Sequence, residues 1–79
     1  MKENSNQTIE RWGIRYTGIV QGVGFRPLVS MWAHSLGLTG FVYNDSQGVY
    51  VEVQGFLGEL QLFLDAVQEE QPRLCRITS

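Results

Sequence analysis

The sequence predicts an α+β domain with the ferredoxin-like βαββαβ order, in which an antiparallel sheet carries two helices on one face. Short runs of β-branched and aromatic residues alternate with period two, as expected for half-buried strands. Two other runs place apolar residues at helical spacing. Their order along the chain is that of the split βαβ motif. The 79 residues allow one small domain, and 43% hydrophobic and 18% charged residues are ordinary globular proportions.

The first half of this order is a strand, a helix and a second strand. Trp12 to Val20 alternates as a strand that places Ile14 and Tyr16 on its inward face. A helix is expected from Pro27 to Leu36, because proline suits the first helical turn. Gly37 would end that helix as a C-cap. The second strand is expected over residues 39–43.

The second half is a strand, a helix and a short last strand. After a turn over residues 45–48, three valines at alternate positions within 49–54 mark a half-buried strand. Residues 57–69 form the clearest amphipathic helix, which Pro72 would end. Its expected apolar face consists of Leu57, Leu60, Phe63, Leu64 and Val67. A strand over 74–78 completes the order.

The polar start of the chain is expected to be a flexible tail over residues 1–10, followed by the domain over 11–79. It lacks the apolar segment of a signal peptide, and no run approaches the length of a membrane span. The net charge of −2 argues against a broad nucleic-acid footprint. The single cysteine excludes an internal disulfide and agrees with a cytoplasmic location.

The stretch from Gly18 to Pro27 is the strongest candidate for a functional site. Gly22 and Gly24 lie between the first strand and the first helix, where glycines admit positive φ and close approach of a ligand. Successive backbone N–H groups in such a turn, together with the helix N-terminus, favour an anion. Arg26 adds donors that match phosphate or carboxylate oxygens. The loop therefore predicts an anion-binding cradle, although a plain tight turn explains the glycines equally well without further information.

Two other phosphate-binding motifs do not fit this stretch. The dinucleotide fingerprint requires a third glycine where Pro27 stands. The nucleotide P-loop requires Gly-Lys-Ser/Thr, and Lys2 is the one lysine in the chain.

The stretch Gly18-x-Val20-Gln21-Gly22-Val23-Gly24-Phe25-Arg26 resembles the signature loop of acylphosphatases, and Gly40-Phe41-Val42-Tyr43-Asn44 is similar to their second motif, Gly-x-Val-x-Asn. The resemblance covers about residues 14–77. Finer features are most similar to the N-terminal acylphosphatase-like domain of the HypF family of hydrogenase maturation carbamoyltransferases. They are Arg26-Pro27, Leu38-Thr39-Gly40, and Asn44-Asp45 followed by Gly48-Val49.

The resemblance implies a site. Phosphate would lie on the backbone amides of Gln21, Gly22, Val23, Gly24, Phe25 and Arg26. The Arg26 guanidinium would hold two phosphate oxygens, and the Asn44 amide would orient a water molecule, so these two residues are the expected catalytic pair. Neither a metal nor a cofactor is expected in this domain. Asp45 and Glu52 are taken as surface charges.

The resemblance also implies a function. The expected activity is binding and hydrolysis of carbamoyl phosphate or another acyl phosphate, with release of inorganic phosphate. The expected partners are downstream domains of the same protein and a maturation protein that accepts the carbamoyl group. A fragment lacking a final edge strand is expected, because acylphosphatases usually continue into a fifth strand. The alternatives are a free-standing acylphosphatase and a phosphate-binding module without turnover. An RNA-binding domain of the same topology is disfavoured, because only Tyr50 provides an aromatic side chain within 48–54.

Overall fold

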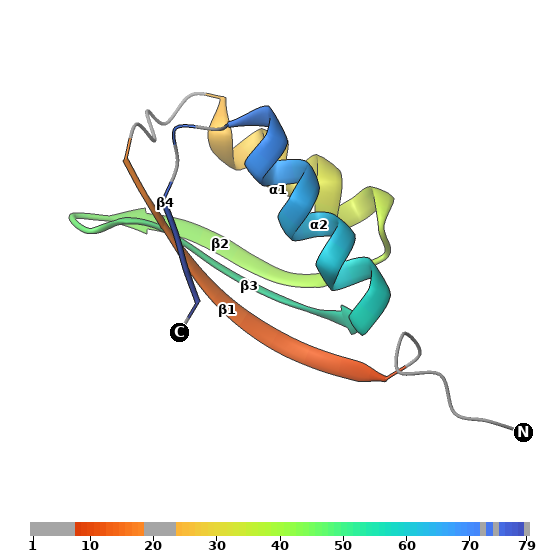
Figure 1. Ribbon diagram of the computed structural model, residues 1–79. Coiled ribbons are helices and arrows are strands. Elements are labelled where there is room, and N and C mark those ends of the chain that lie inside the picture. The colour runs from red at the N-terminus through yellow and green to blue at the C-terminus, as the bar shows by residue number, and fades with distance from the viewer. Residues whose placement is uncertain (1–7, 19–23, 72, 74, 79) are drawn as a thin grey trace, which may run out of the picture.

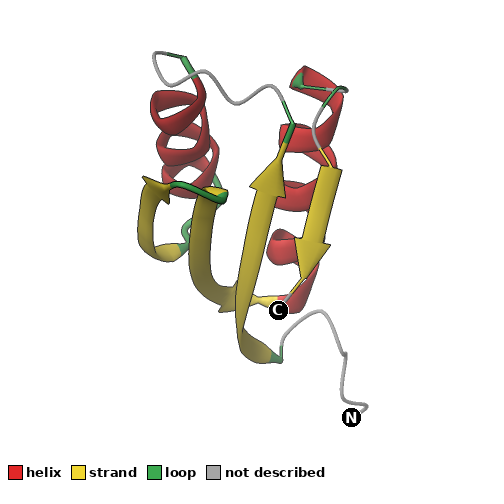
Figure 2. Ribbon diagram, turned by 90° about the vertical axis from the view of Figure 1, so that its left-hand side faces the viewer, coloured by secondary structure: helices red, strands yellow, loops and turns green. Residues whose placement is uncertain are grey.

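A computed structural model describes residues 8–18, 24–71, 73 and 75–78. They form four strands and two helices in the predicted order βαββαβ (Figure 1). The elements are β1 (Ile9–Thr17), α1 (Phe25–Ser35), β2 (Thr39–Asp45), β3 (Gly48–Phe56), α2 (Leu57–Glu70) and β4 (Cys75–Thr78). The strands form one sheet in the order β2-β3-β1-β4, and both helices cover the same face of it (Figure 2).

Every strand pairing is antiparallel, and the register brings distant parts of the chain together. β1 pairs with β3 from Ile9↔Phe56 to Tyr16↔Val49, and with β4 from Ile14↔Thr78 to Thr17↔Cys75. β2 pairs with β3 from Thr39↔Gln54 to Asp45↔Gly48, which leaves a two-residue turn. The ferredoxin-like arrangement expected from the sequence is confirmed.

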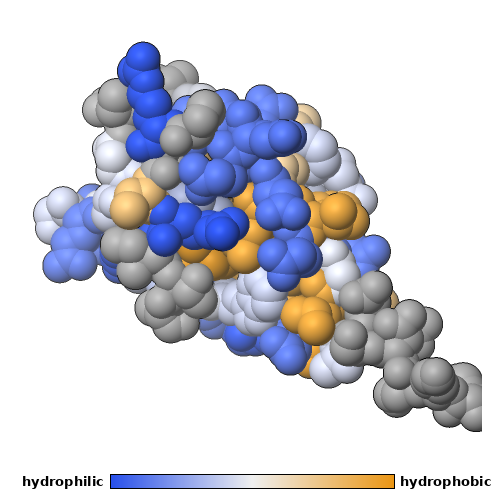
Figure 3. Space-filling view, in the orientation of Figure 1, coloured by the Kyte–Doolittle hydropathy of each residue, from blue (hydrophilic) through white to orange (hydrophobic). Residues whose placement is uncertain are grey.

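The core lies between the sheet and the two helices. It contains alternate residues of the strands and the inward stripes of the helices, as the period-two and helical patterns predict. Its buried members are Ile14, Tyr16, Phe25, Val29, Leu38, Val49, Val51, Val53, Leu60, Phe63, Leu64 and Val67. The side chains at the intervening positions of the strands lie on the uncovered face of the sheet. Apolar groups still reach the surface in patches between hydrophilic ones (Figure 3), and Ile9, Phe41 and Leu62 are among them.

The element boundaries differ from the prediction mainly at β1 and α1. β1 begins at Ile9 and not at Trp12, so Ile9 and Glu10 are part of the sheet and the predicted tail over 1–10 is wrong for them. Pairing with the end of β3 holds Ile9 and Glu10 in the sheet. Just before them, the carbonyl of Thr8 accepts a hydrogen bond from the Leu57 N–H at 2.8 Å. The rest of the predicted tail lies outside the described residues.

The first helix begins two residues earlier than predicted, at Phe25. Phe25 packs on Tyr16 of β1, with ring centroids 5.3 Å apart in an edge-to-face arrangement. This tertiary contact holds Phe25 in the core, and the helix therefore starts before the proline that marks its first turn.

Candidate phosphate-binding site

The N-terminus of α1 has no side-chain cap among the described residues. Gly24 is the N-cap, and no side chain caps the helix or places a carboxylate in its first turn. The carbonyl of Gly24 accepts the first helical bond from the Leu28 N–H at 3.2 Å. The first N–H groups of a helix lack intrahelical partners, and the helix dipole favours negative charge beside them. Within the described residues no side chain satisfies these donors, which are the kind of group that an anion satisfies.

Gly24 differs from the prediction in its backbone conformation. Its φ is −102° and its ψ is −18°, so it does not use the positive φ that only glycine adopts easily. A Cβ built on Gly24 meets no atom within 4 Å. Among the described residues, the space beside this backbone is therefore open. Of the two roles expected for the glycines, positive φ and close approach of a ligand, the conformation of Gly24 agrees with the latter.

Arg26 lies in the first turn of α1 and is exposed. Neither of the two ion pairs found in the described part of the chain involves it. Arg11 and Arg15 are instead each paired with a carboxylate. Among the described residues, the Arg26 guanidinium therefore lies at the helix start without a carboxylate partner.

Asn44 lies at the same end of the sheet as the start of α1. It is opposite Val49 of β3, and Val49 is opposite Tyr16 of β1. Tyr16 contacts Phe25, the first residue of α1. The period of two places Asn44 on the face of the sheet that the helices cover, where Val49 is buried. Residues of both predicted motifs therefore converge on one end of the same layer.

The remaining predicted site residues divide into two groups. Phe25 is buried with 4% of its surface exposed, so its side chain packs in the core and only its backbone is available to a ligand. Gln21, Gly22 and Val23 lie outside the described residues, and their predicted contacts with phosphate stay predictions.

Beneath the site, Tyr16 is fully buried, and its hydroxyl has no hydrogen-bond partner among the described residues. Burial raises the pKa of Tyr16 to about 12, although the positive charge of Arg76 acts in the opposite direction. The phenol is therefore neutral near pH 7 and places no negative charge under the proposed anion position.

In the part of the chain that the structure describes, no three His, Cys, Asp or Glu side chains lie close enough together to hold a metal ion. No described helix is long and apolar enough to cross a bilayer.

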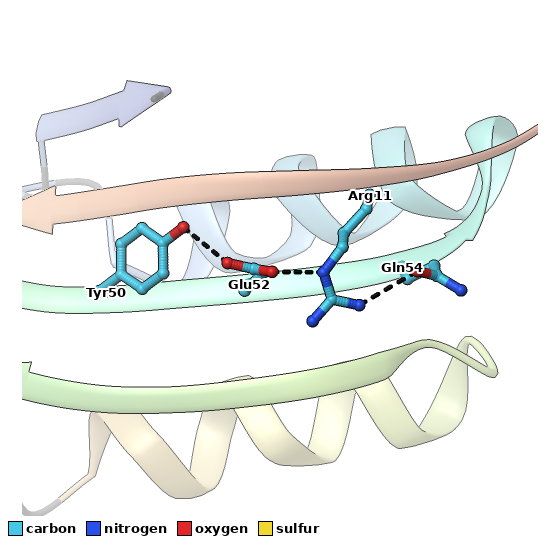
Figure 4. A network of polar contacts seen from close by, with 4 residues as sticks. All are labelled: Arg11, Tyr50, Glu52 and Gln54. Carbon is cyan, nitrogen blue, oxygen red and sulfur yellow. Dashed lines mark hydrogen bonds and ion pairs between the residues drawn. The ribbon is translucent and has the colours of Figure 1, made fainter.

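The uncovered face of the sheet carries a polar network that the sequence did not predict. Arg11 donates to Glu52 and, at 3.1 Å, to Gln54, and the Tyr50 hydroxyl donates to Glu52 at 2.8 Å (Figure 4). Hydrogen bonds from Arg11 and Tyr50 hold the pKa of Glu52 below its ordinary value. Glu52 is therefore a paired strand residue and not an isolated surface charge.

Asp45 has partners of the same kind. Its Oδ1 accepts one hydrogen bond from the Gln47 N–H and another from Arg15 Nη1, each at 2.9 Å. These two donors hold the pKa of Asp45 below its ordinary value. Period-two alternation already placed Arg15 on the outer face, but the partner strand could be recognised only once the register was known.

Aromatic side chains surround this network. Tyr50 contacts Phe41 and Tyr43 of β2, with ring centroids 6.2 and 5.5 Å apart. Tyr50 is therefore part of an aromatic cluster on the uncovered face and not alone there. Its two arginines are paired with carboxylates, so they give the face no excess positive charge for nucleic acid.

Comparison with known proteins agrees with this geometry. The acylphosphatase family matches residues 12–79. The carbamoyltransferase HypF of Rhodobacter capsulatus is 45% identical over 69 residues, which cover 87% of this chain and 9% of that protein. An acylphosphatase of Salinibacter ruber is 42% identical over 71 residues, which cover 89% of this chain and 74% of that protein.

Solved structures give the same result. A full-length HypF crystallised in a phosphate- and nucleotide-bound form superposes with a TM-score of 0.77 and 35% identity, over 91% of this chain and 10% of that one. The acylphosphatase of Bacillus subtilis superposes with a TM-score of 0.75 and 33% identity, over 91% of this chain and 86% of that one. The chain spans about a tenth of the HypF proteins and most of the acylphosphatases. It belongs to the acylphosphatase family, and it is similar to the corresponding domain of HypF carbamoyltransferases.

Proposed function

We propose that this chain binds acyl phosphates and hydrolyses carbamoyl phosphate to carbamate and phosphate, as the N-terminal domain of a HypF-type carbamoyltransferase. One observation carries the proposal. The start of α1, which has no side-chain cap and whose Arg26 forms no ion pair among the described residues, lies at the same end of the sheet as Asn44. A cationic side chain, backbone N–H donors and a neutral side-chain amide are the groups that the proposed hydrolysis of an acyl phosphate uses.

In this proposal each group has one task. The backbone N–H groups of the loop and of the first turn of α1 hold the phosphate, and Arg26 binds two of its oxygens and stabilises charge in the transition state. Asn44 is too weak a base to remove a proton, so it orients a water molecule in line with phosphorus. The water oxygen forms the new P–O bond, the P–O bond to the carbamate breaks, and one proton is released to solvent.

The leaving group explains why these few residues suffice. A carbamate or carboxylate is weakly basic and departs as an anion without a strong general acid. Positioning and charge stabilisation then supply most of the catalysis, as in phosphoryl transfer generally. The proposed reaction therefore proceeds without a metal or cofactor in this domain.

The remaining proposals concern the larger protein. Downstream domains would activate the carbamate and transfer the carbamoyl group to a cysteine of a maturation partner, as part of nickel–iron hydrogenase maturation in the cytoplasm. The similarity to HypF proteins over almost the whole chain supports this placement. No nucleic acid or membrane takes part.

Two alternatives differ in the expected chemistry. A free-standing acylphosphatase is supported by the 42% identity to such a protein over 89% of the chain. A phosphate-binding module would bind the ligand without turnover.

The test is phosphate release from carbamoyl phosphate and from an aromatic acyl phosphate, in the presence of a chelator, by wild type, Arg26→Ala and Asn44→Ala. We expect turnover by the wild type and a loss of about 100-fold or more in each variant. Circular dichroism confirms that all three are folded. Preference for carbamoyl phosphate would favour the HypF assignment over the free-standing enzyme. Ligand-induced stabilisation of a folded wild type without phosphate release would leave only the binding module.

A further inference from the structure

We propose that Arg15 and Asp45, on the opposite face of the sheet from the site, are positioning residues for Asn44. The inference rests on the proposed function, because it concerns the water-orienting role given to Asn44. It starts from the observation that the residue after Asn44 has two fixed partners, whereas the Asn44 side chain has no hydrogen-bond partner in the described part of the chain. The orientation of Asn44 therefore depends on its backbone.

The backbone at this point is the end of an edge strand. β2 pairs with β3 alone, and its last pair, Asp45↔Gly48, closes the two-residue turn. An edge strand that ends in a turn is held on one side only, so it moves more readily than a central strand. Side-chain contacts of Asp45 therefore determine how firmly the end of β2 is held.

Asp45 connects three segments. One carboxylate oxygen accepts a bond from the Gln47 N–H within the turn and another from Arg15 of β1. β1 is not the neighbour of β2, because β3 lies between them. The Arg15 side chain crosses β3 with its guanidinium carbon 5.5 Å from the centre of the Tyr50 ring. The pair therefore connects the end of β2 to β1, an inner strand of the sheet with which β2 does not pair.

The same face supplies a matched control. Arg11 also lies on β1, also faces away from the helices, and also pairs with a carboxylate, Glu52 of β3. Its pair joins two adjacent strands and does not involve the turn. Arg11→Gln and Arg15→Gln remove the same charge from the same strand, but only the second releases the end of β2.

The experiment measures kcat and KM for acyl phosphate hydrolysis by wild type, Arg11→Gln, Arg15→Gln and Arg15→Lys. We expect Arg15→Gln to lower kcat about ten-fold with less than about a two-fold change in KM, since small misplacements of a catalytic group are costly. Arg11→Gln should keep the wild-type kcat, and Arg15→Lys should recover most of it. An equal fall in kcat for both glutamine variants, or a change confined to KM, would overturn the proposal in favour of a general effect of charge.

A second measurement separates this proposal from the proposed function. The side-chain amide signals of Asn44 in a ¹⁵N–¹H correlation spectrum, assigned with Asn44→Ala, report its surroundings without turnover. Arg15→Gln should shift or broaden these signals, and Arg11→Gln should leave them in place. A wild type without turnover would refute the proposed hydrolysis, and these signals would still decide the positioning role. Equal shifts in both variants would refute that role even in an active enzyme.

Discussion

At the scale of single residues, glycine has different tasks at Gly24 and Gly48. Gly24 has a helical conformation with open space where a side chain would be. Gly48 has a φ of +121°, and a Cβ there would lie 2.2 Å from the carbonyl oxygen of Tyr16. Gly24 has no described atom near the place of a side chain, whereas Gly48 lets β3 approach β1 closely after the turn.

Alanine substitutions at these two positions should therefore have opposite consequences. Gly48→Ala should lower the free energy of unfolding by about 2 kcal/mol or more, because it adds backbone strain and a clash with main-chain atoms. Gly24→Ala should change it by less than about 1 kcal/mol, as is usual at a helix N-cap, but it should weaken phosphate binding under the proposed function. Urea denaturation and phosphate titration measure the two effects. A stable Gly48→Ala protein would show that the turn adopts another conformation.

At the scale of elements, α2 shows how much the hydrophobic pattern alone predicts. Its expected span of 57–69 is confirmed within one residue, and four of its five expected inward residues are buried. The alternating valines of β3 likewise mark the covered face of the sheet. These patterns are reliable because each is repeated over several turns or strand positions, so that a single residue does not decide the assignment.

The features that the sequence did not predict depend on tertiary contacts. The start of α1 is set by the packing of Phe25 on Tyr16, and the start of β1 by main-chain pairing with the end of β3. The Arg15–Asp45 pair joins strands that are not adjacent. The sequence motifs identify Arg26 and Asn44 as candidate site residues. That both lie at the same end of the sheet follows only from the strand register.

Two leucines of α2 provide a test at this scale. Leu60 is fully buried, whereas Leu62 is 55% exposed. Leu60→Ala should lower the free energy of unfolding by about 2–4 kcal/mol, because it removes buried apolar surface and leaves a cavity. Leu62→Ala should change stability by less than about 0.5 kcal/mol. Urea unfolding followed by tryptophan fluorescence measures both values, and similar losses in the two variants would contradict the assigned inward face.

At the scale of the whole molecule, the core lies between one face of the sheet and the two helices, and the other face carries charge pairs between strands. A domain of this size buries only about 60% of the surface of its unfolded chain. Its free energy of unfolding is therefore small enough for pH to matter. Acidic pH changes the charge of carboxyl groups, whereas alkaline pH changes that of a buried phenol.

We expect the free energy of unfolding to fall at both ends. The folded pKa values of Asp45 and Glu52 are lowered, so their contribution is present above their unfolded values and is lost as the pH falls below about 4. The folded pKa of Tyr16 is raised to about 12, so its contribution is lost as the pH rises from the unfolded value of 10.0 through 12.

Urea titrations of wild type, Arg15→Gln and Tyr16→Phe from pH 3 to 11 test both halves of this profile. Arg15→Gln should reduce the loss of unfolding free energy at acidic pH alone, because it removes one cause of the lowered pKa of Asp45. Tyr16→Phe should reduce the loss of unfolding free energy at alkaline pH alone. An unchanged alkaline slope in Tyr16→Phe would show that other groups control it.

The central position of β1 has a consequence for how the chain folds. The β2–β3 hairpin closes through a two-residue turn, so it can form early from local contacts. β1 pairs instead with residues that are at least 33 positions away along the chain, from Tyr16↔Val49 upward, and these long loops make its docking slow. Asn44 belongs to the early hairpin, whereas Arg26 follows the late strand. We therefore expect the two halves of the proposed site to meet late in folding, so that a ligand that needs both would bind the folded chain and not its precursors.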